Sequence, residues 1–175
     1  GINMILVLLL YIHFPRATVP SIVFYNLHNC AAVHFIEADN SSYLCSNRKD
    51  STYIYMKNIA ETYWKRKKMP IPHLLLSDYE GRNVWSHKGI VHWRGMNICM
   101  VTDGYWRNKS ATNLLDIDYM YLCKGYKGEI APLQKLFHIK RIVLDASLGD
   151  YKSKAYKEEC KTCLLYTSPS PRDLS

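Results

Sequence analysis

Short runs of β-branched and aromatic residues alternate with polar, turn-forming segments in the first part of the chain. Residues 22–25, 32–36 and 43–46 have the composition of strands. The segments between them are rich in Asn, Asp and Ser, whose short side chains hydrogen-bond their own backbone and so favour turns. We therefore expect residues 21–46 to form three antiparallel strands at the beginning of a domain.

The pattern becomes helical in residues 51–68. Apolar residues recur there at three- and four-residue spacing, which predicts an amphipathic helix that Ser51 can cap. The run KRKK at 65–68 suits the negative end of the helix dipole, and Pro70 and Pro72 stop the helix.

Short strand-like runs return after these prolines. The predicted strands are residues 73–77, 84–87, 90–93 and 97–102. The sequence SHKG at 86–89 predicts a hairpin turn, and Gly95 predicts another break.

The last part of the domain follows a strand, helix, strand order. Residues 118–123 and 140–145 are predicted strands, residues 129–137 a helix between them, and residues 152–161 a final helix. Such a βαβ unit makes its two strands parallel. An antiparallel beginning combined with this unit predicts a layered α/β or α+β fold with helices on the outside.

Both ends of the chain differ in character from the middle. Residues 1–14 contain an apolar run about half as long as the ~20 residues that span a bilayer, and we expect the end of a transmembrane helix, with a linker over 15–20. Residues 163–173, CLLYTSPSPRD, resemble a translated sequencing adaptor. We therefore expect an artefactual tail over 163–175 and one soluble domain over 21–162.

The composition favours a folded basic domain. Of the 175 residues, 48% are hydrophobic, which argues against a disordered chain. The formal charge of +8 favours polyanionic partners such as nucleic acid or anionic lipid. Charge alone does not choose between these partners, and many basic proteins bind neither.

Six cysteines and seven histidines give no metal or catalytic pattern. The cysteines are too scattered for a disulfide framework or paired zinc knuckles, so we expect buried free thiols. The histidines lack the HxH and HExxH spacings that bring ligands to one ion, although His87 and His92 could meet across a hairpin. We therefore predict no cofactor, no metal site and no catalytic residue.

Polar residues near predicted strand ends leave several roles open. Asp103, Asp116, Asp118 and Asp145 lie where open α/β sheets gather functional side chains, but turns and caps use the same residue type. The loop KGYKG at 124–128 precedes a predicted helix, where backbone donors can receive a phosphate, or it is a tight turn.

Aromatic residues next to basic ones are the most direct indication of a ligand. Stacking rings together with phosphate-neutralising cations are what sequence-tolerant binding of single strands requires. The candidate nucleic-acid contacts are Lys65, Arg66, Trp106, Arg107, Lys109, Lys124, Tyr126 and Lys127. Tryptophan is also an ordinary core residue, so a structural role for the same positions stays open.

Four motifs occur in a characteristic order: VFYNLHNCAAVHFIEAD, MVTDGYWRNKSA, DYMYLCKGYKG and IVLDASLGDY. Together they resemble the C-terminal soluble region of ComEC-type competence proteins, which are polytopic membrane channels for single-stranded DNA. The resemblance extends over residues 2–162. It implies a truncated metallo-β-lactamase-like fold at the bacterial inner membrane, with the rest of the competence channel and the uptake machinery as partners.

The chain departs from the metal-binding pattern of the family it resembles. Metal-binding members carry a segment like FLDVGQGDAILI, where this chain has FYNLHNCAAVHF, with Asn26 and Ala31 in place of two aspartates. The HxHxDH loop is absent, and GYKG at 125–128 stands in place of GHHG. The resemblance therefore implies a degenerate sandwich in which Lys124 and Lys127 can still hold phosphate.

We accordingly predict a soluble domain that binds or guides single-stranded DNA at the membrane without metal-dependent cleavage. One alternative is a metal-dependent phosphodiesterase or nuclease with an unrecognised site, for which His28, Asp103 and Asp145 are the candidates. The other is a non-catalytic structural module of a membrane protein that contacts no DNA.

Overall fold

A computed structural model of the chain describes residues 19–27, 30–39, 41–46, 50–75, 78–162 and 166–168. The predicted transmembrane segment at 1–14 and all of the linker except Val19 and Pro20 lie outside these residues. Within the described ranges, no helix combines the length and the apolar character that crossing a membrane requires.

The first sheet is built from the opening strands. β1 (Ser21–Leu27), β2 (Cys30–Ile36) and β3 (Ser42–Ser46) pair antiparallel in sequence order, which confirms the predicted antiparallel beginning. β4 (His73–Leu75) then adds to β3 in parallel. Helix α2 (Asp50–Lys67) provides the connection between these two parallel strands.

The second sheet has seven strands in the order β13-β12-β10-β8-β7-β6-β5. Its antiparallel half is a meander, and the strand bounds are β5 (Tyr79–Glu80), β6 (Val84–His87), β7 (Ile90–Trp93) and β8 (Met96–Val101). Two-residue turns join β6 to β7 and β7 to β8, at Lys88-Gly89 and Arg94-Gly95. The predicted hairpin turn and the predicted break at Gly95 are both confirmed.

The other half of this sheet is parallel. β10 (Tyr119–Leu122) pairs in parallel with β12 (Arg141–Leu144), as the predicted βαβ unit requires. On its other side β10 is also parallel to β8. The helix of the unit, α3 (Ile130–Gln134), is shorter than the predicted span of 129–137. Phe137 instead begins β11 (Phe137–Ile139), which pairs with β9 (Leu115–Ile117) in a small separate sheet.

Helix α4 (Asp150–Thr162) follows β12 and confirms the last predicted helix. Beyond it, β13 (Tyr166–Ser168) pairs in parallel with β12. These three residues belong to the segment that we expect to be an artefactual tail.

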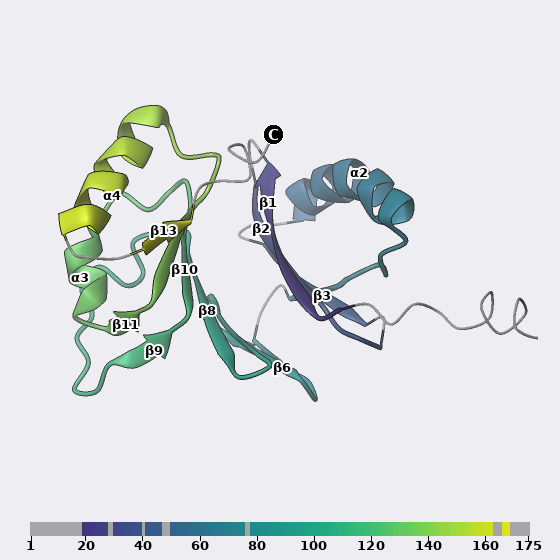
Figure 1. Cartoon of the computed structure of the whole chain (residues 1–175), viewed down its shortest axis with the longest axis horizontal. Helices are drawn as coiled ribbons and strands as arrows, with labels where there is room; N and C mark the ends of the chain where they lie inside the picture. Colours follow the sequence, from purple (N-terminus) through teal and green to yellow (C-terminus); the bar gives the residue numbers. More distant parts are fainter. Residues whose placement is uncertain are drawn as a thin grey trace, which may run out of the picture.

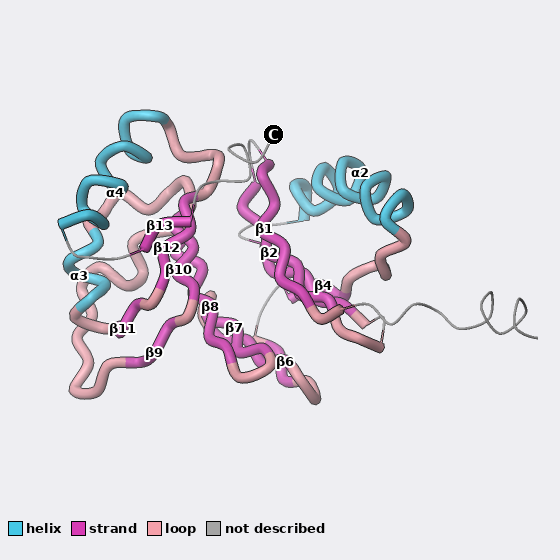
Figure 2. The backbone as a smooth tube through the Cα atoms, in the orientation of Figure 1, coloured by secondary structure: helices cyan, strands magenta, loops and turns pink. Residues whose placement is uncertain are grey.

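The elements stack in four layers, α2, first sheet, second sheet, and α3 with α4, and the helices lie on the outside (Figure 1). This layered α+β sandwich confirms the predicted fold class. The two sheets cross the middle of the molecule, with helices on either side of them (Figure 2). Between the sheets, Phe35 of β2 packs against Trp93 of β7 at a centroid distance of 5.6 Å.

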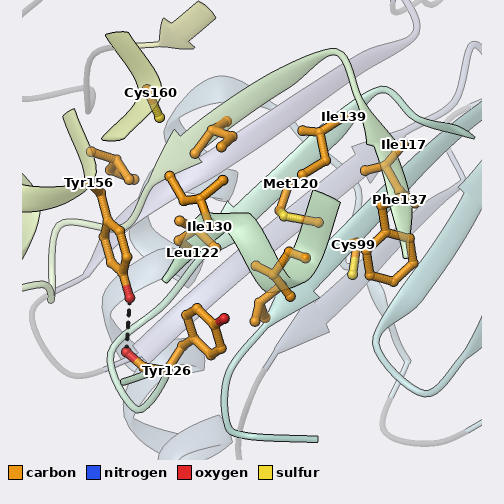
Figure 3. Close-up of a cluster of buried hydrophobic side chains, with 14 of the residues drawn as sticks. Cys99, Ile117, Met120, Leu122, Tyr126, Ile130, Phe137, Ile139, Tyr156 and Cys160 are labelled. Carbon is orange, nitrogen blue, oxygen red and sulfur yellow. Dashed lines mark hydrogen bonds between the residues drawn. The ribbon is translucent and has the colours of Figure 1, made fainter. Parts of the chain in front are cut away.

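Strand β2 is buried along its whole length because it has packed layers on both faces. Ala31, Val33 and Phe35 contribute to the core between the sheets, whereas Cys30 and Ala32 contribute to the core under α2. The third core lies between the second sheet and the pair α3 and α4 (Figure 3). Fully burying a large apolar side chain stabilises a fold by about 1.5–3 kcal/mol, so these cores are the main source of stability.

One buried carboxylate joins the two sheets. Glu37, just after β2, accepts hydrogen bonds from Trp93 Nε1 at 2.6 Å and from Arg94 at 2.9 Å. Both donors come from the β7–β8 hairpin of the other sheet. Buried charges are tolerated only when paired and hydrogen-bonded, and this arrangement provides both.

Candidate nucleic-acid interface

The parallel strands β8, β10 and β12 end at a common edge of the second sheet. The segments that leave this edge begin at Thr102, Cys123 and Asp145. Two of them touch: Gly125 has φ +116, and a Cβ added there would clash with the carbonyl oxygen of Thr102. Only glycine fits this close approach, and it brings Lys124 beside the loop at 103–113.

The loop at 103–113 presents one exposed aromatic ring with two lysine ammonium groups near it. Tyr105 is 41% exposed, and the ammonium nitrogens of Lys109 and Lys88 lie 4.1 Å and 5.9 Å from its ring centroid. Lys109 comes from the same loop, whereas Lys88 comes from the β6–β7 turn. We call Lys88, Tyr105 and Lys109 the Tyr105 cluster.

Local hydrogen bonds hold the Tyr105 ring in place. The backbone N–H of Tyr105 donates to Asp103 Oδ1 at 2.8 Å, and that of Arg107 donates to the carbonyl of Gly104 at 3.0 Å. The Trp106 ring lies edge-on to Tyr105 at 4.7 Å and packs against Phe137 at 5.1 Å. Trp106 therefore anchors the loop to the core below α3 and α4 and leaves Tyr105 facing solvent.

Tyr126 is a core residue in this structure. It is only 2% exposed, its hydroxyl donates to the carbonyl of Glu129 at 2.7 Å, and its own carbonyl accepts from Tyr156 at 3.2 Å (Figure 3). Burial raises the pKa of the Tyr126 phenol. In this arrangement the ring shows no face on which a base can stack.

The basic candidates fall into two separate groups. Arg107, Lys109, Lys124 and Lys127 are exposed and belong to the loops that leave the common strand edge. The positive charge of Arg107 opposes the rise in pKa that burial causes at Tyr126 and Tyr156.

Lys65 and Arg66 form the second group, in the last turn of α2. Both are exposed, and Lys65 pairs with Glu61 at 2.8 Å. Helix α2 covers the outer face of the first sheet, on the other side of the sandwich from α4 (Figure 1). The structure thus brings five of the eight candidate residues to one region and leaves these two apart, with Tyr126 buried beneath the first group.

The aspartates and histidines at the strand ends have protein partners. Asp145 is buried and accepts hydrogen bonds from the hydroxyls of Tyr121 and Ser147. His87 pairs with Asp78 and His92 with Asn97, each at 2.7 Å, so the two histidines do not converge on one point. Within the described ranges, His, Cys, Asp and Glu side chains form no group of three that could hold a metal ion. His28, which the hydrolase alternative combines with Asp103 and Asp145, lies outside those ranges.

The cysteines behave as small apolar residues. The five that the structure describes, Cys30, Cys45, Cys99, Cys123 and Cys160, are buried and not disulfide-bonded, which confirms the prediction for these positions. Burial raises the pKa of Cys45 and of Cys99 to about 12 and that of Cys123 well above its usual value. The nucleophilic form of a cysteine is the thiolate, so these thiols are inert near neutral pH.

Lys88 belongs to the Tyr105 cluster, but the aromatic–basic motifs did not identify it. It lies 17 positions before Tyr105 in the sequence, and only the β6–β7 hairpin brings it to the ring. The SHKG motif predicted the hairpin turn that contains Lys88, but it did not indicate that this turn would lie next to Tyr105.

Comparison of the sequence with known families gives a match to one family. A model of that family, described as the ComEC C-terminal domain, matches residues 22–165. No curated protein and no solved structure matches the chain.

Proposed function

Because the chain belongs to the family of ComEC C-terminal domains, which functions in competence DNA uptake, we propose that its domain binds and guides single-stranded DNA. In this proposal the domain acts at the bacterial inner membrane beside the rest of the channel and does not cut the strand. The membrane context is that of the family.

The observation that carries the proposal is the Tyr105 cluster. The ammonium groups of Lys109 and Lys88 lie over the exposed Tyr105 ring. In this proposal a base takes the place of Lys109 on the ring, and the two lysines contact the adjoining phosphates. Rings used only for packing are normally covered, as Trp64, Trp93 and Tyr121 are here. Exposure alone does not decide this, since Tyr151 on α4 is 87% exposed. The combination of an exposed ring with two nearby ammonium groups at Tyr105 favours a ligand over a structural module without one.

The neighbouring loops extend the positive surface along the strand edge. Lys124, Arg107 and Lys127 neutralise further phosphates in this proposal, and Trp106 positions the loop rather than stacking on a base. Lys65 and Arg66 form a separate basic site on α2, so a strand held at Tyr105 does not need them.

Binding of a fluorescent oligothymidylate, measured by anisotropy over a series of salt concentrations, tests the proposal. Tyr105→Ala removes one stacking surface and is expected to weaken binding by about 5- to 150-fold, the range that corresponds to ~1–3 kcal/mol per stacked base. Lys109→Ala is expected to make the salt slope shallower by about 0.7, the value for one phosphate contact on a single strand.

An exposed lysine away from this strand edge serves as the matched control. Lys57→Ala on α2 removes the same charge as Lys109→Ala and is expected to leave affinity and slope unchanged. No binding at low salt, or an equal loss in the control variant, would contradict the proposed interface.

A cleavage assay on the same oligonucleotide distinguishes guidance from hydrolysis. The proposal predicts intact DNA with added Mn²⁺ or Zn²⁺. Cleavage that EDTA abolishes would overturn it in favour of the phosphodiesterase alternative.

A further inference from the structure

A pocket of about 610 Å³ opens at the far end of the β6–β7 hairpin from Lys88. Its walls come from the β5–β6 connection, from β6 and β7, and from the β7–β8 turn. The polar and aromatic residues that line it are Glu80, Arg82, Asn83, Trp85, His92 and Arg94. Pockets for small molecules and single ligand groups span about 300–1,000 Å³, so this one can admit a nucleotide.

Trp85 gives this pocket a flat aromatic wall. The strand register places Glu80, Trp85 and His92 in one row across β5, β6 and β7, on the same face of the sheet. The indole is 42% exposed, which makes Trp85 the most exposed of the four tryptophans. His87 lies beside it with ring centroids 6.0 Å apart and planes 32° from parallel.

The charges around the pocket select a weakly charged ligand. Arg82 and Arg94 face one exposed acid, Glu80, and Arg94 is also paired with the buried carboxylate of Glu37 at 2.9 Å. Arg82 also faces Asp39, so the nearby carboxylates balance the two guanidinium charges and the pocket has no surplus charge to attract a free triphosphate. A phosphate that is already part of a bound strand can still accept hydrogen bonds from the remaining guanidinium N–H groups. Because Glu37 fixes the Arg94 guanidinium, little side-chain entropy is lost when that group binds.

The pocket and the Tyr105 cluster lie at opposite ends of one hairpin. Trp85, His87 and Lys88 follow one another along β6 and its turn, and three residues of a strand span ~10 Å. A strand of DNA with one base at Tyr105 can therefore follow the hairpin and place a later base at Trp85.

We propose that this pocket holds one nucleotide of the guided strand, with its base stacked on Trp85 and its phosphate bound by Arg82 and Arg94. This inference rests on the proposed function, because it assigns a second contact to the same single strand. In this proposal the DNA strand runs along the β6–β7 hairpin between its contact at Tyr105 and its contact at Trp85.

Photocross-linking with the whole chain tests the inference. The probe is a single-stranded oligonucleotide of about 12 residues, within the site sizes of single-strand-binding modules, with 5-bromouracil in place of thymine. Irradiation followed by peptide mapping is expected to give adducts at both Tyr105 and Trp85. Adducts at Tyr105 without Trp85 would overturn the pocket and leave the proposed function standing, whereas adducts at neither would overturn both.

Affinity measurements with variants give an independent readout. Trp85→Ala is expected to weaken binding of this probe at least about five-fold, and Trp85→Phe to restore most of it, because stacking needs a ring rather than an indole. Arg82→Ala is the matched test of the phosphate contact, since Arg94 is tied to buried Glu37 and its removal endangers folding. Unchanged binding in both Trp85→Ala and Arg82→Ala would contradict the pocket assignment.

Discussion

Lysine and arginine occupy every left-handed position that the described ranges assign to a residue other than glycine. Lys68, Lys88 and Arg94 have φ values of 54°, 47° and 49°. Two-residue hairpin turns with this geometry normally carry Asn, Asp or Gly, and a left-handed residue with a Cβ costs roughly 1–2 kcal/mol. Two of these cations belong to the proposed DNA path, so the strain coincides with proposed function, as it often does.

Replacing Lys88 therefore separates stability from binding. Lys88→Gly is expected to raise the free energy of unfolding by about 1 kcal/mol, because glycine adopts the left-handed conformation freely, and to weaken DNA binding. Urea denaturation and anisotropy measure the two effects. Lys88→Ala keeps the strain but removes the charge, so it should bind as weakly without the gain in stability. Equal stability of the two variants would disprove the strain argument.

His34 is a buried titratable group with an incomplete hydrogen-bond set. Its Nδ1 lies 2.8 Å from the hydroxyl of Tyr25, whereas Nε2 is buried without a partner. The side chain packs beside Trp64 at 5.8 Å, under α2. Burial lowers the pKa of His34 from 6.5 to about 4.

This shift predicts a pH-dependent loss of stability. Between about pH 6.5 and pH 4 the unfolded chain binds a proton at His34 that the folded chain does not, so the free energy of unfolding falls as the pH falls. The total effect is about 3 kcal/mol, since one pKa unit corresponds to ~1.4 kcal/mol. Denaturation of the wild type and of His34→Phe over this range measures it. The variant should show the shallower dependence, and parallel curves would contradict the assignment.

Residue types in the sequence could not distinguish exposed rings from buried ones. Tyr105 and Tyr126 both adjoin lysine or arginine along the chain, but one faces solvent and the other lies beneath α4. The difference depends on packing partners, Phe137 for the Tyr105 loop and Tyr156 for Tyr126, that are far away in sequence. Lys88 was missed for the same reason.

At the scale of elements, local patterns predicted the structure where a segment was long or carried a clear turn. β1 to β3, α2, the β6–β7 hairpin and α4 all formed as predicted. β9 and β11 have only three residues each, which is too few for the alternation of apolar and polar residues typical of a strand to be recognised. Competition with β11 also explains the short α3, because Phe137 is buried in the strand pair rather than on a helix face.

The status of β13 can be decided by truncation. If residues 163–175 are foreign to the domain, a chain ending at Thr162 should keep its free energy of unfolding within about 0.5 kcal/mol, the usual range for peripheral changes. Thermal or urea denaturation gives the comparison. A chain ending at Gly149 is the positive control, since it loses the buried Tyr156 and Cys160 of α4 and should unfold. A large loss on removing the tail alone would instead make β13 an integral strand.

At the scale of the whole molecule, the positive charge of the sequence indicated a polyanion but not its location. The described part of the chain carries cations on the loops at one strand edge, on the β6–β7 hairpin, on α2, at the start of β12 and along α4. Only the arrangement in three dimensions distinguishes a continuous path from scattered charges. The outer position of the helices was predicted from the sequence, since a helix buries one face against a sheet and leaves the other in solvent. The order of the two sheets between the helices was not. The path along β6 and β7 depends on register, which the sequence did not reveal.

The hydrogen bonds at Glu37 have a mechanical consequence. Apolar contacts between two sheets have no preferred direction, so on their own they resist separation better than sliding. The carboxylate of Glu37 contacts Trp93 and Arg94 at 2.6 Å and 2.9 Å, and hydrogen bonds of this kind depend strongly on distance and angle. The hydrogen bonds of Glu37 therefore resist sliding of one sheet over the other. A pulling force that a bound DNA strand exerts on the β7–β8 hairpin would be distributed over both sheets.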